Sequence, residues 1–448
     1  MNNKENFTIG SVKKRILFQA VPLILAQFVQ LAYNIIDRVY IGRIQDSGVA
    51  LTGVGITFPI ITFIVANTNL FGLGGVALFS ITRGKGDDER AKKILGNVMG
   101  LQIITAVLLM VGMYVFMKPI LYKFGASDES YVYARDYLSI YMLGTVFFML
   151  GSGLNGFINA TAHPGMGMLT TLIGAVLNMI LDPIFIYGFG MGVKGAAIAT
   201  VISQFVSFVW VMSFILFKFS LKLSKSDLYL SADIVKRVIV MGFPYYIMQA
   251  TNSLVQLSCN VTLAKYGSDV YIGVMTVVNS VREMMALPVS GITGGSQPVL
   301  GYNYGAKRYD RVREGIRFTA FLGIAYTAFA WIVVLIIPKE LMNIFTNDEA
   351  MIEAGVRALF LYFFGFIFMA FQFVGQATFQ SLGYAKHAIF FSIFRKVIIV
   401  VPLTFLLPMM GLGVDGVFIA EPVSNLIGGL ACFITMYITV YRRLGREK

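Results

Sequence analysis

The stretch GMGVKGAAIAT at residues 190–200 returns as GLGVDGVFIAE at residues 411–421, which is 221 positions later. A second pair of segments, RGKGDDER at 83–90 and YGAKRYDR at 304–311, aligns at the same offset. Separated matches at one spacing indicate that the second half of a chain repeats the first. We therefore expect a fold made of two similar halves.

A third match and the segment between the halves indicate where the chain divides. Pro22 pairs with Pro244 at an offset of 222. The segment 218–235 is rich in charged residues and serines, which is typical of a linker. We predict an N-terminal six-helix lobe at 1–220 and a C-terminal six-helix lobe at 221–448.

The composition is that of a membrane protein. Of the 448 residues, 57% are hydrophobic and 13% are charged, whereas soluble domains average roughly 25% charged residues. The apolar runs are long and continuous, as at 101–117 and 318–337. Runs of about 20 apolar residues are typical of spanning helices, whereas barrel strands are shorter and alternate in polarity. We predict an all-α integral membrane protein.

The apolar runs and the loop charges predict the topology. We expect twelve transmembrane helices at about 16–42, 50–82, 94–117, 131–159, 166–190, 194–217, 236–264, 271–300, 316–337, 353–382, 387–410 and 415–441. Lys and Arg number 24 in the tails and loops on one side and 8 on the other. Cytoplasmic loops carry the excess of these residues. We therefore expect a multi-pass protein of the cell inner (plasma) membrane with both termini in the cytoplasm.

Several function classes find no support in the sequence. The two cysteines and two histidines lie far apart, so no metal-ligand spacing occurs. There is no GxxxxGK[ST] motif and no Ser/His/Asp arrangement, which argues against an ATP-driven pump or a hydrolase. The basic residues lie in short loops and orient the chain in a membrane, so nucleic acid is not an expected partner. We expect no cofactor and no enzymatic activity.

Polar side chains follow one face of several predicted spans. Gln27, Gln30, Asn34 and Asp37 are spaced by 3, 4 and 3 residues, which places them on one side of a helix. Such faces avoid lipid and meet protein or a water-filled cavity. We predict that a central cavity is lined by polar residues from both halves. These residues are Gln30, Asn34, Gln249, Asn252, Gln256, Glu283, Gln372, Gln376 and Arg395. The alternative is hydrogen bonding between helices alone.

The sharpest signal is a group of polar residues at one depth of the N-terminal half. Asp37 lies roughly 8 Å, Thr200 roughly 9 Å and Asp182 roughly 12 Å below the outer surface, at 1.5 Å per helical residue. Asn178 precedes Asp182 by one helical turn, and Pro183 frees a backbone carbonyl nearby. A carboxyl group inside a membrane is costly, which marks it as functional. The group could bind a proton, or Na⁺ through oxygen ligands.

Other readings of the charged residues stay open at this point. Asp37 could be a structural residue that pairs with Arg38 or with water. Glu283 could attract a cationic substrate or meet a partner on another helix, and Arg395 could face the cavity. Lys396 could extend its amine to the cytoplasmic surface. Glu421 occupies the position equivalent to Thr200 in the second half.

Together these segments resemble the multidrug and toxic compound extrusion (MATE) family of secondary transporters over nearly the whole chain. The resemblance rests on AVPLILAQFVQLAYNIIDRVYIG at 20–42, LNMILDPIFIYGFGMGVKGAAIAT at 177–200 and QPVLGYNYGAKRYDRVREG at 297–315. It implies export of small molecules, namely drugs or organic cations, in exchange for H⁺ or Na⁺ and without ATP. We expect such a transporter to be a monomer in the lipid bilayer.

The match is to the branch of the family that keeps its carboxylates in the N-terminal half. In that branch the residues that match Asp37, Asn178, Asp182 and Thr200 are implicated in cation binding. The carboxylates that another branch uses in its second half are absent here, where amides occur instead. A lipid-linked precursor flippase of the same superfamily is the alternative, and for its pyrophosphate only Arg282, Arg395 and Lys396 are available.

Overall fold

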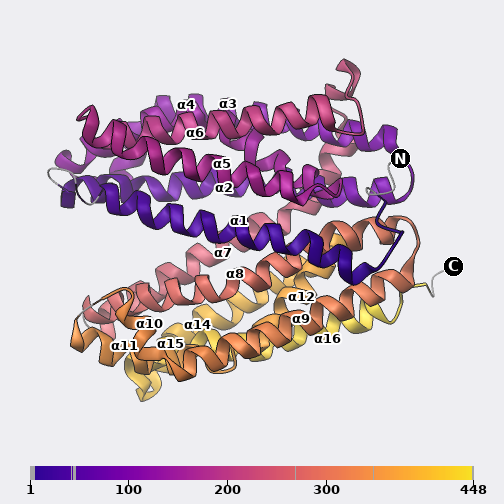
Figure 1. Ribbon diagram of the computed structural model, residues 1–448. Coiled ribbons are helices and arrows are strands. Elements are labelled where there is room, and N and C mark those ends of the chain that lie inside the picture. Colours follow the sequence, from indigo (N-terminus) through magenta and orange to yellow (C-terminus); the bar gives the residue numbers. More distant parts are fainter. Residues whose placement is uncertain (1–5, 42, 44–46, 268, 347, 446–448) are drawn as a thin grey trace. The chain divides into compact units, whose positions relative to one another are not determined.

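A computed structural model describes residues 6–41, 43, 47–267, 269–346 and 348–445. The described residues form helices joined by short connections, with no strand among them, which confirms the all-α prediction (Figure 1). The longer helices are α1 (Val12–Ile41), α2 (Ser47–Gly84), α3 (Asp88–Lys123), α4 (Asp128–Ala160), α5 (Pro164–Pro183), α6 (Val193–Ser213), α7 (Ala232–Tyr266), α8 (Asp269–Gly305) and α9 (Tyr309–Ile336). The shorter ones are α10 (Pro338–Asn343), α11 (Glu349–Tyr362), α12 (Phe368–Ser381), α13 (Ala385–Ile393), α14 (Val401–Leu407), α15 (Gly413–Ser424) and α16 (Leu430–Met436).

Within the described ranges, nine helical stretches are long and apolar enough to cross a membrane. One of them, Ala385–Tyr441, has 57 residues, about twice the length that one crossing needs. Gly411, with φ of 96°, interrupts this stretch, and only a residue without Cβ adopts such a backbone readily. The stretch therefore provides two crossings. The chain is a multi-pass membrane protein, and the number of twelve helices stays a prediction.

Short polar side chains begin several of the helices. The Asp87 carboxylate accepts a hydrogen bond from the Arg90 amide at 2.9 Å and caps α3. Ser127 accepts from the Ser130 amide at 3.2 Å and caps α4. The first amides of a helix have no partner inside it. These caps satisfy them where the chain turns back between spans.

The helices form two compact units, and the units exchange parts of their first helices. Unit 1 contains Leu25–Tyr245, and unit 2 contains Phe7–Ile24 and Tyr246–Lys448. Unit 2 thus includes the first part of α1, and unit 1 includes the first part of α7. A boundary near residue 220 describes the sequence repeat. The contacts instead divide the chain just after Pro22 and Pro244, the two prolines that the repeat aligns.

Glycines permit the close packing of these exchanged segments. In unit 2, a Cβ on Gly295 of α8 would lie 2.6 Å from the backbone nitrogen of Ala20 in α1. In unit 1, a Cβ on Gly74 of α2 would collide with the backbone of Val238 and Gly242 in α7. Gly295 follows Gly74 by 221 positions, so the repeat extends to this backbone contact. Helices that approach so closely need residues without side chains at the crossing.

The packing of unit 1 positions the polar group that the sequence singles out. Helix α4 packs against α2, α3 and α6, and α5 packs against α6. After Pro183, α5 continues as a wide helical turn at Ile184–Gly188. The Tyr187 hydroxyl of this turn donates to the Tyr40 carbonyl at the end of α1, at 2.7 Å. This bond fixes the end of α5 beside the end of α1, where Asp182 and Asp37 lie.

Candidate functional site

Unit 1 brings the four predicted cation-coupling residues together. Asp182 is fully buried, and Asn178 and Thr200 are 1% and 5% exposed. When the Asn178 amide is oriented to satisfy both of its ends, its nitrogen donates to Asp182 Oδ2 at 2.7 Å. Its oxygen then accepts from the Thr200 backbone amide at 3.2 Å. Helices α5 and α6 are thus joined through a buried carboxyl group and an amide.

The fourth residue, Asp37 of α1, completes the site. Its carboxyl group lies within hydrogen-bonding reach of the Asp182 carboxyl group. The other oxygen, Asp182 Oδ1, is buried and meets no N–H or O–H donor among the described groups. Two carboxyl groups can share a hydrogen bond only when one of them carries a proton. The pair is therefore suited to hold one exchangeable positive charge.

Three tyrosines around the pair do not figure in the predicted site. Tyr33 of α1 interacts electrostatically with Asp37 and Asp182, and its hydroxyl is within hydrogen-bonding reach of Thr200. Tyr137 of α4 also reaches Thr200. Tyr137 and Tyr141 are 6% and 3% exposed, and their rings stack with centroids 5.9 Å apart. Helical spacing could have identified these tyrosines in the sequence, because Tyr33 precedes Asp37, and Tyr137 precedes Tyr141, by one turn.

The oxygen donors of this site fit a small hard cation as well as a proton. Carboxylate, amide and hydroxyl oxygens are the groups that hard cations prefer. In the part of the chain that the structure describes, no group of three or more His, Cys, Asp or Glu residues could hold a metal ion. Any Na⁺ here would rely on Asp37 and Asp182 together with the neutral oxygens of Asn178 and Thr200.

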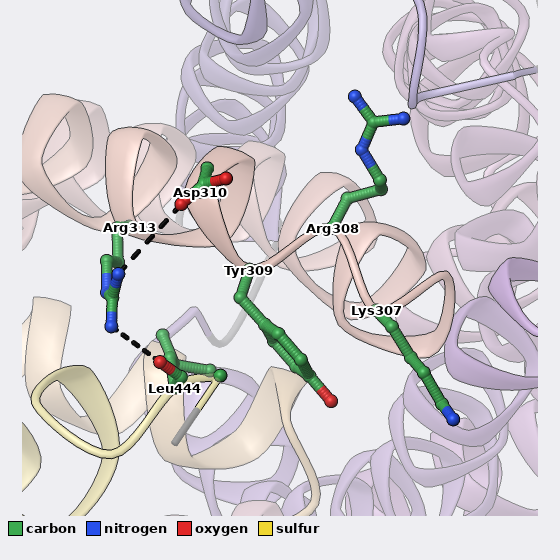
Figure 2. A pocket seen from close by; sticks show the side chains of 7 residues that line it. Lys307, Arg308, Tyr309, Asp310, Arg313 and Leu444 are labelled. Carbon is green, nitrogen blue, oxygen red and sulfur yellow. Dashed lines mark hydrogen bonds and ion pairs between the residues drawn. The ribbon is translucent and has the colours of Figure 1, made fainter. Parts of the chain in front are cut away.

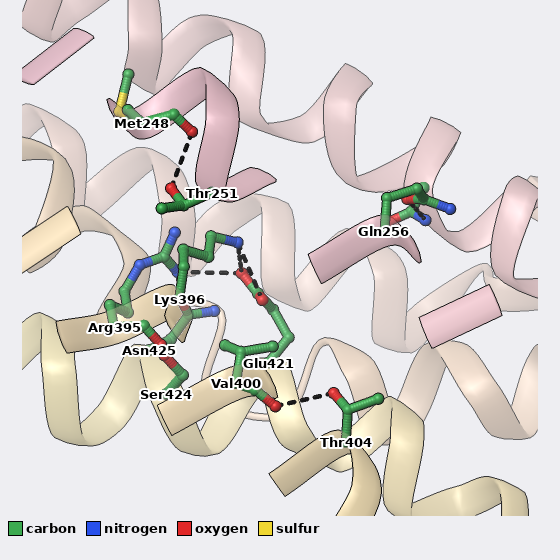
Figure 3. A network of polar contacts seen from close by, with 11 residues as sticks. Met248, Thr251, Gln256, Arg395, Lys396, Val400, Thr404, Glu421, Ser424 and Asn425 are labelled. Carbon is green, nitrogen blue, oxygen red and sulfur yellow. Dashed lines mark hydrogen bonds and ion pairs between the residues drawn. The ribbon is translucent and has the colours of Figure 1, made fainter. Parts of the chain in front are cut away.

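Unit 2 contains a different buried network, which Figure 3 shows. Lys396 donates to both oxygens of Glu421, at 2.9 and 3.1 Å. Arg395 donates to Glu421 Oε1 at 3.0 Å and to Asn425 Oδ1 at 2.6 Å. Lys396 is only 4% exposed, so the prediction that it extends to the cytoplasmic surface is wrong. A buried charge requires a paired and hydrogen-bonded partner, and the Glu421 carboxylate provides it for Lys396.

Two of the predicted cavity-lining amides belong to the interior of unit 2. Gln376 of α12 donates to the Ala388 carbonyl and to Ser392 Oγ of α13, both at 3.0 Å. Gln372 and Gln376 are 6% and 5% exposed. The Gln376 bonds are hydrogen bonding between helices, the alternative that the sequence left open. For Gln372 and Gln376, cavity lining stays a prediction.

The other predicted cavity residues lie nearer to the molecular surface. In α1, Gln30 donates to Asn34 at 3.3 Å, and both side chains are exposed. In α7, exposed Gln256 donates to Asn260 at 3.2 Å and accepts from Asn279 of α8 at 2.9 Å. Three further members complete the set: Gln249 and Asn252 are partly exposed and Glu283 is exposed. For these residues and for Arg395, cavity lining stays a prediction. The Arg38 side chain, the suggested partner of Asp37, lies outside the described residues.

The family comparison matches both halves of the chain. The MatE family model matches residues 22–184 and 244–406. These spans are related by 222 positions, in agreement with the repeat found in the sequence. Together they cover well over half of the 448 residues.

Relatives and solved structures match over almost the full length. The multidrug export protein MepA of Staphylococcus saprophyticus is 26% identical over 442 residues, 96% of this chain and 95% of the relative. MepA of Staphylococcus aureus strain MRSA252 is 24% identical with the same coverage. A crystal structure of MATE in the straight conformation has a TM-score of 0.93 at 22% identity and covers 99% of this chain and 100% of that one. A MOP superfamily transporter from Pyrococcus furiosus also gives 0.93 at 22% identity, with 99% of both chains covered. The structural similarities establish the fold.

Proposed function

Because the chain belongs to the MatE family, we propose that it is a secondary active antiporter that exports amphipathic or cationic drugs or metabolites in exchange for H⁺ or Na⁺. Members of this family are transporters, so the chain is not an enzyme. The name multidrug export protein carried by the Staphylococcus relatives supports small-molecule substrates. We place the protein in the cell inner (plasma) membrane as a monomer with cytoplasmic termini.

The observation that carries the proposal is the Asp37–Asp182 pair, in which Asp182 is fully buried and Asp37 is partly exposed. Two carboxylates a hydrogen bond apart repel each other, so one cation between them lowers the energy of the pair. A proton or Na⁺ that arrives from outside reduces the charge of the pair from −2 to −1, relieves the repulsion and lets α1 and α5 pack together. Loss of the cation to the cytoplasm restores the repulsion and favours the arrangement that accepts substrate.

The energy for export comes from the gradient of the coupling ion. Movement of one charge across the membrane potential supplies about 2.3 kcal/mol per 100 mV. Asn178 and Thr200 supply neutral oxygens and hydrogen bonds that keep Asp182 in place. No nucleotide or organic cofactor is needed in this scheme.

Transport by reconstituted protein tests the assignment. Proteoliposomes are given a pH gradient or a Na⁺ gradient, each alone, and ethidium export is recorded. Asp37→Asn and Asp182→Asn should abolish coupled export without loss of folding. Asp136→Asn is the matched control, because this unit 1 carboxylate pairs with Lys194 at 3.3 Å and lies outside the site. Normal proton-driven and sodium-driven export by both Asn variants would overturn the proposal.

A lipid-linked precursor flippase remains the second candidate, favoured by one observation. Arg282, Arg395 and Lys396 interact electrostatically around Glu421 in unit 2. A flippase needs cations that are free to bind a pyrophosphate, whereas Arg395 and Lys396 already bind Glu421. Expression in a pump-deficient host discriminates the two. An antiporter lowers the sensitivity of the host to cationic dyes, and a flippase leaves it unchanged.

A further inference from the structure

The charges buried in unit 2 do not cancel. Arg395 and Lys396 both bind the single carboxylate of Glu421, which is 4% exposed. Arg282 of α8 also interacts electrostatically with Glu421 and with Lys396. Two cationic side chains therefore bind one buried carboxylate, and a third interacts with it electrostatically. Figure 3 shows Arg395 and Lys396 reaching Glu421 from the same helical segment.

The excess of positive charge does not depend on the state of the lysine. Arginine side chains stay protonated in proteins, so Arg282 and Arg395 alone outnumber Glu421. Tyr362 and Cys259 also interact with Arg282, but a phenol and a thiol are ordinarily neutral at pH 7. The remaining acidic neighbour, Glu283, is exposed, so water can solvate it.

Arg282 has binding capacity that the network leaves unused. Its Nε is buried and finds no hydrogen-bond acceptor among the described groups. A guanidinium group presents its N–H donors in a planar fork that matches a carboxylate. Arg282 is partly exposed, so an anion can reach it. It shares the Glu421 carboxylate with two other cations, and excess charge is unfavourable at membrane depth. The excess positive charge and the unpaired Nε–H of Arg282 both favour binding of an anion.

We propose that unit 2 contains a binding site for a monovalent anionic group of the carboxylate type. Arg282 is its main ligand, and Arg395 and Lys396 supply the positive field. The ligand is either a free small anion or the acidic end of a transported molecule. This site goes beyond the proposed cation exchange, because it lies in the other unit and has the opposite charge.

Binding of a matched pair of probes tests the site. The midpoint of thermal unfolding of the full-length protein in detergent is followed at constant ionic strength with benzoate or with neutral benzamide. A ligand that binds the folded state raises this midpoint. Benzoate should raise it and benzamide should not. Arg282→Gln should weaken the apparent affinity for benzoate at least tenfold.

Two further variants keep the test decisive. Arg282→Lys retains the charge but loses the planar fork, so it should fold and bind benzoate several-fold more weakly. Lys118→Gln removes an exposed cation of unit 1 and should leave benzoate binding unchanged. Equal shifts by benzoate and benzamide, or an unchanged benzoate shift in both Arg282 variants, would overturn the proposal.

Transport distinguishes the two sources of the anion. If the acidic group belongs to a cargo, proteoliposomes should exchange labelled benzoate, and Arg282→Gln should raise the KM of this exchange. If the site takes a free anion, benzoate binds without being exchanged. Both results support the site. Because binding is measured without a gradient, failure of cation-coupled export leaves this test intact.

Discussion

The two units use their buried charges in opposite ways. In unit 1, Asp37 and Asp182 lie together, and the buried Oδ1 of Asp182 meets no donor in the described structure. In unit 2, Glu421 occupies the position that Thr200 holds in the repeat, and it binds two cations of the chain itself. A carboxyl group with an unpaired oxygen is suited to exchange a mobile cation, as we propose for Asp182. A carboxylate held by a guanidinium and an ammonium group of the same chain is not, so the two repeats carry a proposed exchange site and a fixed network.

Replacement of Glu421 should cause the largest loss of unfolding free energy among the variants considered. Glu421→Gln leaves Arg395 and Lys396 buried without a carboxylate, which costs about 3–5 kcal/mol of unfolding free energy. Chemical unfolding in detergent measures the loss. The control is Asp415→Asn, which removes an exposed ion pair with Arg357 and should cost at most about 1 kcal/mol. Equal losses in the two variants would contradict a fixed network.

The reverse pattern is expected in unit 1. Asp182→Asn keeps the shape of the side chain but cannot exchange a cation, so coupled export should fall at least about a hundredfold, which corresponds to ~2.7 kcal/mol. Its unfolding free energy should change by less than about 1 kcal/mol, because a buried carboxyl group is replaced by a neutral amide. Gradient-driven dye export and chemical unfolding on the same preparation measure both. A large stability loss with normal export would reverse the assigned roles of the units.

Overpacking the glycine crossings tests whether the units share their architecture. Gly295→Ala forces a Cβ against the backbone of Ala20 and should cost about 1–3 kcal/mol. Gly74→Ala, at the equivalent position of unit 1, should cost a similar amount. Gly112→Ala is the control, since no atom lies within 4 Å of its added Cβ. That variant should be neutral or more stable by up to about 1 kcal/mol. Unequal losses of unfolding free energy at Gly295 and Gly74 would show that the two units share the sequence repeat but not this packing.

The smallest expected loss of stability is in the segment before α7, and this loss should depend on pH. Asp227 accepts hydrogen bonds from the Ser224 amide and hydroxyl, both at 2.8 Å. Burial raises the pKa of Asp227, but the bonds from Ser224 outweigh it and hold the pKa below its usual value. Asp227→Asn should destabilise this segment locally by about 1 kcal/mol, seen as faster amide hydrogen exchange at 224–231.

The sign of the pH dependence follows from the lowered pKa. The stabilisation by Asp227 is complete above the usual carboxyl pKa near 4 and is lost as the pH falls through the lower value in the folded state. The variant and the parent should therefore differ at neutral pH and converge in acid. Asp310→Asn, at an exposed position whose carboxylate lies 3.9 Å from Arg313, provides a control without this change. Figure 2 shows Asp310 and Arg313 at the start of α9.

The fold class, the repeat and the four residues of the unit 1 site could be predicted from the sequence alone. Long apolar runs can satisfy their backbone in a bilayer only as helices, and an offset of 221 or 222 aligns the halves. Asp37, Asn178, Asp182 and Thr200 could be placed at one depth because each position along a helix has a known height. These properties depend only on position along the chain.

Packing between the helices determines which side chains come into contact. The exchange of the first parts of α1 and α7 between units depends on backbone approach at glycine crossings. The burial of Lys396 on Glu421 and of Gln376 on Ser392 depends on how neighbouring helices are rotated. A helical period gives the face of a residue but not the partner opposite it. That partner is set by packing, and packing distinguishes the proposed exchange site of unit 1 from the fixed network of unit 2.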